Sequence, residues 1–402
     1  MTSFLNKQFG KNASDEKLNL LVYSVDASQI EGKASAVIWP ASKEDVYKVI
    51  RYAHRTDSTI TPRGAGTGLA GAAVPQDSIV VDFSKMDKII KIDPKSKTVI
   101  VEPGVILDNL NKELAKHNLF FPVIPASHKV CTIGGMISTN AAGMRAIRYG
   151  KTMEWIKGLE IIDGMGRVMT ANDKNIKHFC GREGTTGIII KAKLNLAELT
   201  KIRSLDIFKL ETMPELMDVV KSLDPEKLNA IEFIDKIAAR IAGLKSLYYY
   251  LFVEYNDDTG EIFDEKDIDE SWKMRENVGI VLSSEGYGIK EDPKIPLKDI
   301  PQFISWLEQH DIPSFGHLGI GILHPRFKTG DLLPEMYRLV EELGGEVSGE
   351  HGIGLKKKDY VKEDFRQTMH MLKKKYDPEA ILNKNKLIDS NNKDNQNEPR
   401  TQ

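Results

Sequence analysis

Four side chains that could bind a metal or move a proton are concentrated in two short, glycine-rich stretches of the C-terminal half. They are two histidines in the first stretch, and a glutamate and a histidine in the second: His317, His324, Glu350 and His351. Two imidazoles and a carboxylate form a common ligand set for zinc, manganese or iron. A further imidazole beside such a set can act as a general base. The pattern therefore favours metal-assisted chemistry over the alternative that these histidines are ordinary core residues.

The spacing of the first two histidines sets a condition on the backbone between them. His317 and His324 are seven residues apart, which places their side chains on opposite faces of a regular strand. A site that uses both imidazoles therefore requires a bend or bulge, which Gly319 and Gly321 could supply.

A second chemical feature is a loop near the N-terminus with the composition of an anion cradle. Residues 62–71 contain four glycines, so that successive N–H groups can turn inward towards anionic oxygens. Arg63 adds a permanent cation and Thr67 adds a hydroxyl donor. The loop lacks the Gly-Lys-Ser/Thr ending of a Walker A loop, and no strong helix start follows it as a dinucleotide fingerprint requires. The loop therefore predicts a pyrophosphate site, with an ordinary turn as the alternative.

The elements around this loop are predicted to form a β-α-β unit. Residues 34–39 form a strand that Pro40 ends, Ser42 has the character of a helix N-cap, and residues 46–53 follow helical spacing. A second strand over residues 59–62 leads into the glycine loop, so the anion site follows a strand, where α/β folds bind their ligands.

Two more loops of small residues follow in the same half of the chain. Residues 131–143 combine glycines with Ser, Thr and Asn donors, and residues 181–190 open a strand with a similar loop. Between them, residues 155–162 and 167–170 are predicted to pair as a hairpin around an Asp-Gly turn.

The three loops in this order resemble the PCMH-type FAD-binding domain of the vanillyl-alcohol oxidase superfamily. The motifs that carry the resemblance are Pro62-Arg63-Gly64-Ala65-Gly66-Thr67, Pro125-Ala126-Ser127, residues 132–143, Arg148-Tyr149-Gly150 and Glu183-Gly184-Thr185-Thr186-Gly187-Ile188. The resemblance implies that residues 63–68 bind the FAD pyrophosphate and that the later loops line the flavin and the ribityl chain. The expected cofactor-binding residues are Arg63, Gly64, Ala65, Gly66, Thr67, Gly68, Pro125, Ser127, Thr132, Gly134, Gly135, Thr139, Asn140, Ala142, Gly143, Glu183, Gly187 and Ile188.

Some members of that superfamily link the flavin covalently to a histidine or a cysteine of these loops. The loop over residues 63–68 contains neither residue type, so we expect non-covalent FAD. Cys131 lies close by and is expected to be a buried small residue.

From Arg203 onward, strand-like and helix-like runs alternate and predict an α+β domain with an antiparallel sheet. One such helix is expected over residues 261–276. Together with Trp272-Lys273-Met274-Arg275-Glu276 and Asp377-Pro378 with Ile381-Leu382-Asn383, the two histidine stretches resemble the C-terminal domain of FAD-linked D-2-hydroxyacid dehydrogenases. That family includes D-lactate dehydrogenases, the flavin subunit of glycolate oxidase and D-2-hydroxyglutarate dehydrogenase.

This second resemblance assigns roles to individual residues. It implies that a divalent metal binds to His317, His324 and Glu350, with zinc as the first choice and manganese or iron as alternatives. It makes His351 the general base, which removes the hydroxyl proton while a hydride passes from the α-carbon to flavin N5. The remaining implied roles are a clamp on the substrate carboxylate, made by Arg275 and Lys290, and a position near the flavin for Asn383.

The chain departs from the family pattern beside the metal ligands. Relatives usually carry an Asp and an Asn between the two histidines, where this chain has Ile320 and Ile322. These apolar side chains leave less polar support for a metal. Arg326 replaces a typical Asn two residues after the second histidine, which could favour a substrate with an extra acidic group.

The expected fold is therefore α+β, with a two-subdomain FAD-binding domain and a substrate domain on an antiparallel sheet. The predicted boundaries are a lead-in over residues 1–33, the FAD-binding domain over 34–200, the substrate domain over 201–345, a segment over 346–389 that completes the active site and returns to the FAD domain, and a disordered tail over 390–402.

The implied activity is FAD-dependent oxidation of a D-2-hydroxy acid of the D-lactate, glycolate or D-2-hydroxyglutarate type to the 2-oxo acid. The electrons would pass to a quinone, a cytochrome, an electron-transfer flavoprotein or an iron–sulfur partner. Two alternatives stay open: a flavoenzyme without net oxidation, like the related alkyldihydroxyacetone-phosphate synthases, and a non-catalytic flavin-binding subunit of an oxidase complex. A homodimer and a hetero-complex also both stay open.

Composition narrows the remaining classes. The 402 residues carry a formal net charge of −2, so no overall basic field attracts nucleic acid. Two cysteines make a disulfide framework unexpected and are typical of a reducing compartment. No run reaches about 18 apolar residues, and the N-terminus lacks the apolar core of a signal peptide. We therefore expect a cytoplasmic protein, with peripheral contact to the inner face of a membrane left open.

Overall fold

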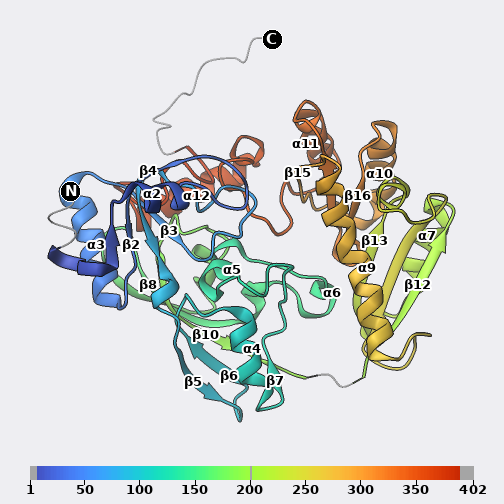
Figure 1. Ribbon diagram of the computed structural model, residues 1–402, viewed down its shortest axis with the longest axis horizontal. Helices are drawn as coiled ribbons and strands as arrows, with labels where there is room; N and C mark the ends of the chain where they lie inside the picture. The colour runs from blue at the N-terminus through green and yellow to red at the C-terminus, as the bar shows by residue number, and fades with distance from the viewer. Residues whose placement is uncertain (1–6, 200–201, 390–402) are drawn as a thin grey trace.

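The computed structural model describes residues 7–199 and 202–389, so the predicted disordered tail lies outside the described residues. Two lobes are visible, with the first half of the chain in one and the antiparallel sheet of the second half in the other (Figure 1). Short 3-10 turns join many elements: η1 (Gly10–Asn12), η2 (Phe83–Lys85), η3 (Thr152–Trp155), η4 (Ile176–His178), η5 (Pro225–Lys227), η6 (Leu297–Asp299), η7 (Leu318–Ile320) and η8 (Lys358–Tyr360).

The first lobe begins with a four-stranded sheet that carries the glycine loop at the end of one strand. Its order is β1 (Ala13–Ser14), β2 (Lys33–Ile38), β4 (Gln76–Asp82) and β3 (Ile60–Arg63), with β2, β4 and β3 parallel. Helix α2 (Lys17–Tyr23) precedes β2. Helix α3 (Lys43–Thr56) follows β2 and begins as predicted, because the Ser42 side chain accepts a hydrogen bond from Asp45 N. Its apolar face packs into one core with this sheet.

The second part of this lobe is a five-stranded antiparallel sheet. Its order is β5 (Ile89–Asp93), β6 (Thr98–Val101), β10 (Ile188–Asn195), β8 (Ile156–Ile162) and β9 (Val168–Ala171), and the predicted hairpin is confirmed as β8 and β9. Helices α4 (Leu107–Ala115) and α5 (Ile133–Thr139) share its core. The remaining elements are α6 (Ala146–Tyr149) and a small sheet of β7 (Leu119–Phe120) with β11 (Ala197–Glu198).

The other lobe is built on the antiparallel sheet expected from the sequence. Its six strands run in the order β12 (Ser204–Leu210), β14 (Tyr249–Tyr255), β13 (Leu228–Ile234), β16 (Ser314–His317), β17 (Ile322–Phe327) and β15 (Ile289–Lys290). Helices α7 (Met213–Ser222), α10 (Ile300–Gln309) and α11 (Leu333–Glu342) share a core on one face. Helices α8 (Lys236–Ile241) and α9 (Glu265–Ser284) share a second core with Phe315 on the other face, and α9 runs alongside the sheet (Figure 1).

The end of the described chain packs on the first lobe. Helix α12 (Glu363–Tyr376) buries Met369, Leu372 and Tyr376 in the core of the five-stranded sheet. Beyond it, the backbone runs beside β3, because Ile60 N donates to Ile381 O and Asn383 N donates to Ile60 O, both at 2.7 Å. The loop between α11 and α12 therefore crosses from one lobe to the other.

Candidate active site

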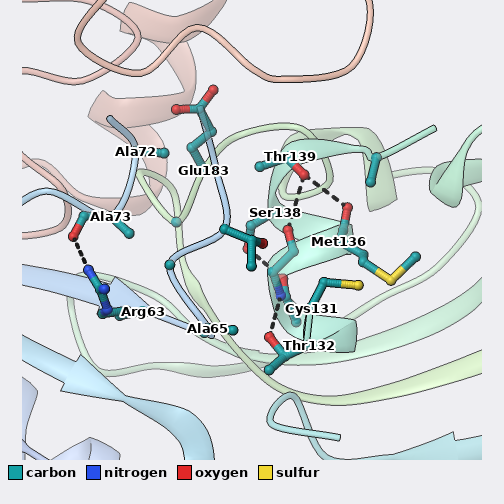
Figure 2. A pocket seen from close by; sticks show the side chains of 18 of the residues that line it. Arg63, Ala65, Ala72, Ala73, Cys131, Thr132, Met136, Ser138, Thr139 and Glu183 are labelled. Atoms are coloured by element: carbon teal, nitrogen blue, oxygen red, sulfur yellow. Dashed lines mark hydrogen bonds between the residues drawn. The ribbon is translucent and has the colours of Figure 1, made fainter. Parts of the chain in front are cut away.

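A cavity lies between the two sheets of the first lobe and is lined by all three glycine-rich loops (Figure 2). Glu350 and His351 also line it, so the cavity reaches the histidine cluster of the other lobe. All of the predicted cofactor-binding residues of these loops line it except two, Asn140 and Gly143. Asn383, which the family resemblance placed near the flavin, is also outside the lining.

The glycine loop offers unused backbone donors to this cavity. Within the described residues, the N–H groups of residues 65–68 donate no hydrogen bond to the protein. Space is tight where the loop meets α5, because a Cβ added to Gly64 would lie 2.3 Å from Thr132 Oγ1. By contrast, a Cβ on Gly68 would meet nothing within 4 Å. Free amides beside open space fit an anionic, pyrophosphate-bearing cofactor.

Arg63 has a different part in this loop from the one expected. Its guanidinium turns back to donate to Val25 O at 2.8 Å and Ala73 O at 3.4 Å, and it lies over the Tyr23 ring (Figure 2). The side chain therefore ties together the two ends of the glycine loop, while the backbone amides are left to meet the anion.

The three residues outside the lining have structural roles that explain their types. Asn140 ends α5 in the left-handed conformation and accepts a hydrogen bond from Met153 N at 2.9 Å. Gly143 packs on backbone, since a Cβ there would lie 2.2 Å from Ile124 O. Asn383 is buried and donates to Ala72 O at 3.0 Å and Glu183 O at 2.6 Å, which holds two of the cavity-lining segments together.

The two histidines project from one face of a hairpin. Strands β16 and β17 pair with Phe315 opposite His324, so His317 and His324 are diagonal neighbours on the same side of the sheet. The bend expected between them is the turn η7 with Gly321, which has φ +73°. A side chain at Gly321 would lie 2.2 Å from Ile295 O, so the turn requires glycine.

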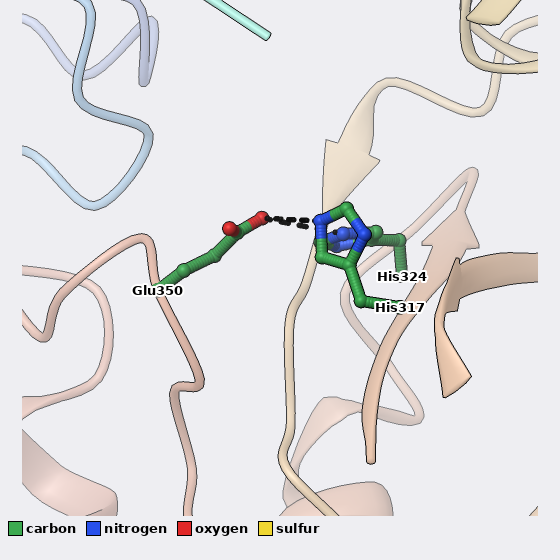
Figure 3. Close-up of side chains that lie close together, drawn as sticks. All are labelled: His317, His324 and Glu350. Atoms are coloured by element: carbon green, nitrogen blue, oxygen red, sulfur yellow. Dashed lines mark ion pairs between the residues drawn. The ribbon is translucent and has the colours of Figure 1, made fainter. Parts of the chain in front are cut away.

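These histidines and Glu350 meet at one point (Figure 3). Glu350 Oε1 is 3.5 Å from His317 Nε2 and 3.3 Å from His324 Nε2. The three potential ligand atoms lie within 4.8 Å of one another. Burial lowers the pKa of His324 to about 4, which leaves a neutral imidazole at ordinary pH. Burial opposes ionisation of Glu350, but His317 and the other imidazoles hold its pKa well below the usual range.

Glu232 supports this cluster and was missed in the sequence. From β13, its buried Oε1 accepts a hydrogen bond from His317 Nδ1 at 2.5 Å, which directs Nε2 of that ring towards Glu350. Burial would lower the pKa of His317, but the carboxylates of Glu232 and Glu350 raise it to about 10. A glutamate between the apolar Ile231 and Phe233 was the signal that could have identified it.

The loop that carries Glu350 is fixed by Asp292, a second residue that sequence reasoning missed. Its Oδ2 accepts hydrogen bonds from Glu350 N and His351 N, both at 2.7 Å, and from Ser348 Oγ at 2.9 Å. Its Oδ1 pairs with the buried Lys357. Burial alone would raise the pKa of Asp292, but His351 and Lys357 lower it to about 2. The negatively charged Asp292 carboxylate therefore holds residues 348–351 in place.

His351 lies between this aspartate and the ligand cluster. Its Nδ1 is 3.5 Å from Asp292 Oδ1, and its Nε2 is 3.4 Å from Glu350 Oε1. The ring stacks on His324 with centroids 5.3 Å apart. Glu183 accepts hydrogen bonds from Ile353 N at 2.6 Å and Gly354 N at 2.9 Å, so the loop is also held from the cofactor cavity.

The isoleucine at position 322 has a packing role in this arrangement. A Cβ on Gly349 would lie 2.5 Å from Ile322 Cγ1, so the loop that presents Glu350 rests directly on this side chain. Ile322 therefore supports the loop by packing instead of by a polar contact, and His317, His324 and Glu350 still come together.

The two expected clamp residues lie on the same side of the sheet as the histidines. Arg275, on α9, is buried, pairs with Glu232 and has its guanidinium carbon 4.6 Å from the Phe315 ring centroid. Lys290, on β15, faces Arg326 directly across the sheet. Burial lowers the pKa of Lys290, and the neighbouring cations Arg326 and Lys356 lower it further. The structure thus gathers positive charge beside the cluster.

Comparison with known proteins gives these observations a family. Residues 34–172 match the model of an FAD binding domain, and residues 251–387 match the C-terminal domain of FAD linked oxidases. The fold and the two matched domains define an FAD-binding flavoprotein. More narrowly, the chain is similar over most of its length to FAD-linked dehydrogenases and oxidases of 2-hydroxy acids.

Individual relatives cover most of the chain. It is 27% identical to a D-2-hydroxyglutarate dehydrogenase of Stutzerimonas stutzeri, over 88% of this chain and 91% of the relative. Identity is also 27% to a glycolate oxidase subunit of Bacillus subtilis (94% of each chain), and 28% to a D-lactate dehydrogenase of Archaeoglobus fulgidus (88% and 91%). A solved alkyldihydroxyacetonephosphate synthase matches with TM-score 0.66 and 16% identity over 95% of this chain and 84% of that chain, which shows the shared fold. Among the described residues, no helix has the length and apolarity needed to cross a membrane.

Proposed function

We propose that this protein oxidises a D-2-hydroxy acid to the 2-oxo acid and passes the electrons to a separate acceptor. The observation that carries the proposal is the position of Glu350 and His351, which line the cofactor cavity and also meet the two histidines of the other lobe. A substrate placed there contacts the flavin-binding lobe and the proton-transfer groups together.

FAD, when bound, supplies the two-electron acceptor of the reaction. The free amides of residues 65–68 suit its pyrophosphate, and the small residues along α5 allow close approach of the rest. Cys131 lines the cavity, but burial raises the pKa of its thiol to about 11, so little thiolate is available to form a covalent link. We therefore expect FAD to bind without a covalent link.

A divalent metal, with zinc as the first choice and manganese or iron as alternatives, would bind to His317, His324 and Glu350. The donor set fits, because two imidazole nitrogens and one carboxylate oxygen converge and Glu232 orients the His317 ring through Nδ1. Such an ion would lower the pKa of the substrate hydroxyl.

His351 is the proposed general base. The negative charge of Asp292, 3.5 Å from Nδ1, favours a proton on that nitrogen, which would leave Nε2 to accept the hydroxyl proton of the substrate. As this proton and the hydride on the α-carbon depart, the C–O bond becomes a carbonyl. Arg275 and Lys290 hold the substrate carboxylate, with Arg275 able to donate two parallel hydrogen bonds.

Substitution of His351 tests the proposal. The variant His351→Ala should retain FAD and metal, while flavin reduction by substrate falls by at least about 100-fold, as expected for loss of a general base. His310→Ala is the matched control, because this partly exposed imidazole lies at the end of α10 and bonds to Trp306 O. A His351→Ala protein that is reduced at the normal rate would refute the assignment.

A further inference from the structure

The substrate side of the sheet carries more positive charge than one carboxylate requires. Among the described residues, neither Lys290 nor Arg326 has an ion-pair partner within 4.0 Å. Arg326 Nε and Nη1 are buried without a hydrogen-bond partner, and so is Arg275 Nε. Buried donors left unpaired are destabilising. Three unpaired, buried nitrogens of two neighbouring guanidinium groups, those of Arg326 and Arg275, indicate a missing anion.

Arg326 is aimed at the same space as the groups proposed to handle the substrate. It lies two residues beyond His324 on β17, on the same face and about 6–7 Å further along the strand. Lys290 is its direct cross-strand neighbour. Its guanidinium carbon lies 5.1 Å from the Phe315 ring centroid, and the Arg275 guanidinium contacts that same ring. Both cations therefore contact the same aromatic ring at one end of the site.

The neighbouring helix leaves room for this side chain. Gly279 on α9 has no side chain, and a Cβ placed there would lie 3.3 Å from Arg326 Nη2 and 3.1 Å from the Phe315 ring. The absence of a side chain at Gly279 thus keeps the Arg326 guanidinium beside Phe315. Arg275 has a partner in Glu232, whereas Arg326 has no protein carboxylate to neutralise it among the described residues.

We propose that Arg326 binds a second anionic group of the substrate, a carboxylate or a phosphate, and thereby selects 2-hydroxy acids that carry two anionic groups. This inference rests on the proposed oxidation of a 2-hydroxy acid. In it, Arg275 and Lys290 hold the carboxylate next to the reacting carbon, and Arg326, beside Lys290, holds the second anionic group.

Matched substrates test the selection directly. Anaerobic flavin reduction is measured with D-2-hydroxyglutarate against D-2-hydroxyvalerate, which differ by a carboxylate in place of a methyl group, and with 3-phospho-D-glycerate against D-glycerate. For the wild-type protein, kcat/KM for flavin reduction should be higher with at least one of the dianionic acids than with its monoanionic partner. Preference for the first pair identifies a carboxylate, and preference for the second identifies a phosphate. Equal rates within both pairs would overturn the proposal.

Variants attribute the preference to the residue. Arg326→Gln should lower kcat/KM for the preferred dianion by about 10–100-fold, as expected for loss of a charged hydrogen bond, and change the monoanion by less than about threefold. Arg326→Lys should restore part of the preference. Lys328→Gln, an exposed cation two residues further on, is the charge-matched control. An equal loss with both members of a pair would show a general structural role instead. FAD content and melting temperature identify any variant that fails to fold.

A binding measurement separates this proposal from the proposed function. If no hydroxy acid reduces the flavin, the oxidation proposal fails, and 2-oxoglutarate is then titrated against the flavin absorbance with 2-oxovalerate as its monoanionic partner. Weaker binding of 2-oxoglutarate alone in Arg326→Gln would still support an anion site at Arg326. Equal binding in wild type and variant would overturn it.

Discussion

The contact between Glu232 and His317 gives a sharp prediction about metal affinity. In Glu232→Gln, the oxygen of the amide can still accept from His317 Nδ1, but the negative charge that fixes this ring is lost. Loss of such a carboxylate partner typically weakens metal binding by about 10–100-fold, which corresponds to about 1.4–2.7 kcal/mol. The neighbouring Arg275 also loses its buried counter-charge, so the melting temperature should fall as well.

The assay is equilibrium competition for zinc between the protein and a chromophoric chelator, with FAD content followed by absorbance. Glu232→Gln should bind zinc about 10–100-fold more weakly than the wild-type protein and keep its flavin. Asp311→Asn is the control, because this exposed carboxylate of the same lobe pairs with Arg240 far from the ligands. Unchanged zinc affinity in Glu232→Gln, or an equal loss in Asp311→Asn, would refute the role given to Glu232.

Three further substitutions follow from close contacts. Gly349→Ala should lower kcat/KM, because the new Cβ meets Ile322 Cγ1 at 2.5 Å and displaces the loop of Glu350. Adding Ile322→Ala should restore part of this loss in a double-mutant cycle. Additive losses in the double variant would contradict the contact. Gly134→Ala should reduce FAD occupancy, since its Cβ would lie 2.6 Å from Pro103 Cβ and shift α5; full flavin content in the purified variant would count against this. Lys357→Met should lower the free energy of unfolding by about 3–5 kcal/mol, because it leaves the buried Glu291 and Asp292 without their cation. An unchanged midpoint in denaturant unfolding would contradict this role of Lys357.

The parts of the site that depend on local composition could be predicted from the sequence. The glycine loop, α5 and the strand after Glu183 line one cavity. Their small residues and free amides indicated this role, because both features can be recognised from the composition of each segment. The bend between the two histidines was also predicted, since Gly321 provides the turn that their spacing requires. In these cases the neighbouring residues alone determine the geometry.

The supporting carboxylates could not be predicted because they depend on tertiary register. Glu232 reaches His317 across neighbouring strands that are distant in sequence, and Asp292 supports residues 348–351 from another element. Helix α9 begins at Glu265, where Asp264 is the N-cap, and ends at Ser284, so the predicted range of 261–276 was wrong at both ends. Val278 and Leu282 are buried and continue the helix beyond the predicted end. Arg275 is buried because that packing encloses it.

Anaerobic titration of the purified flavoprotein with paired D- and L-2-hydroxy acids, followed by the flavin absorbance, tests whether the protein oxidises D-2-hydroxy acids. We expect at least one D-acid to bleach the flavin and its L-isomer to leave the flavin oxidised. A protein that binds FAD but is bleached by no 2-hydroxy acid would contradict the proposed reaction. A protein that cannot be loaded with FAD at all would contradict the assignment of the cavity itself.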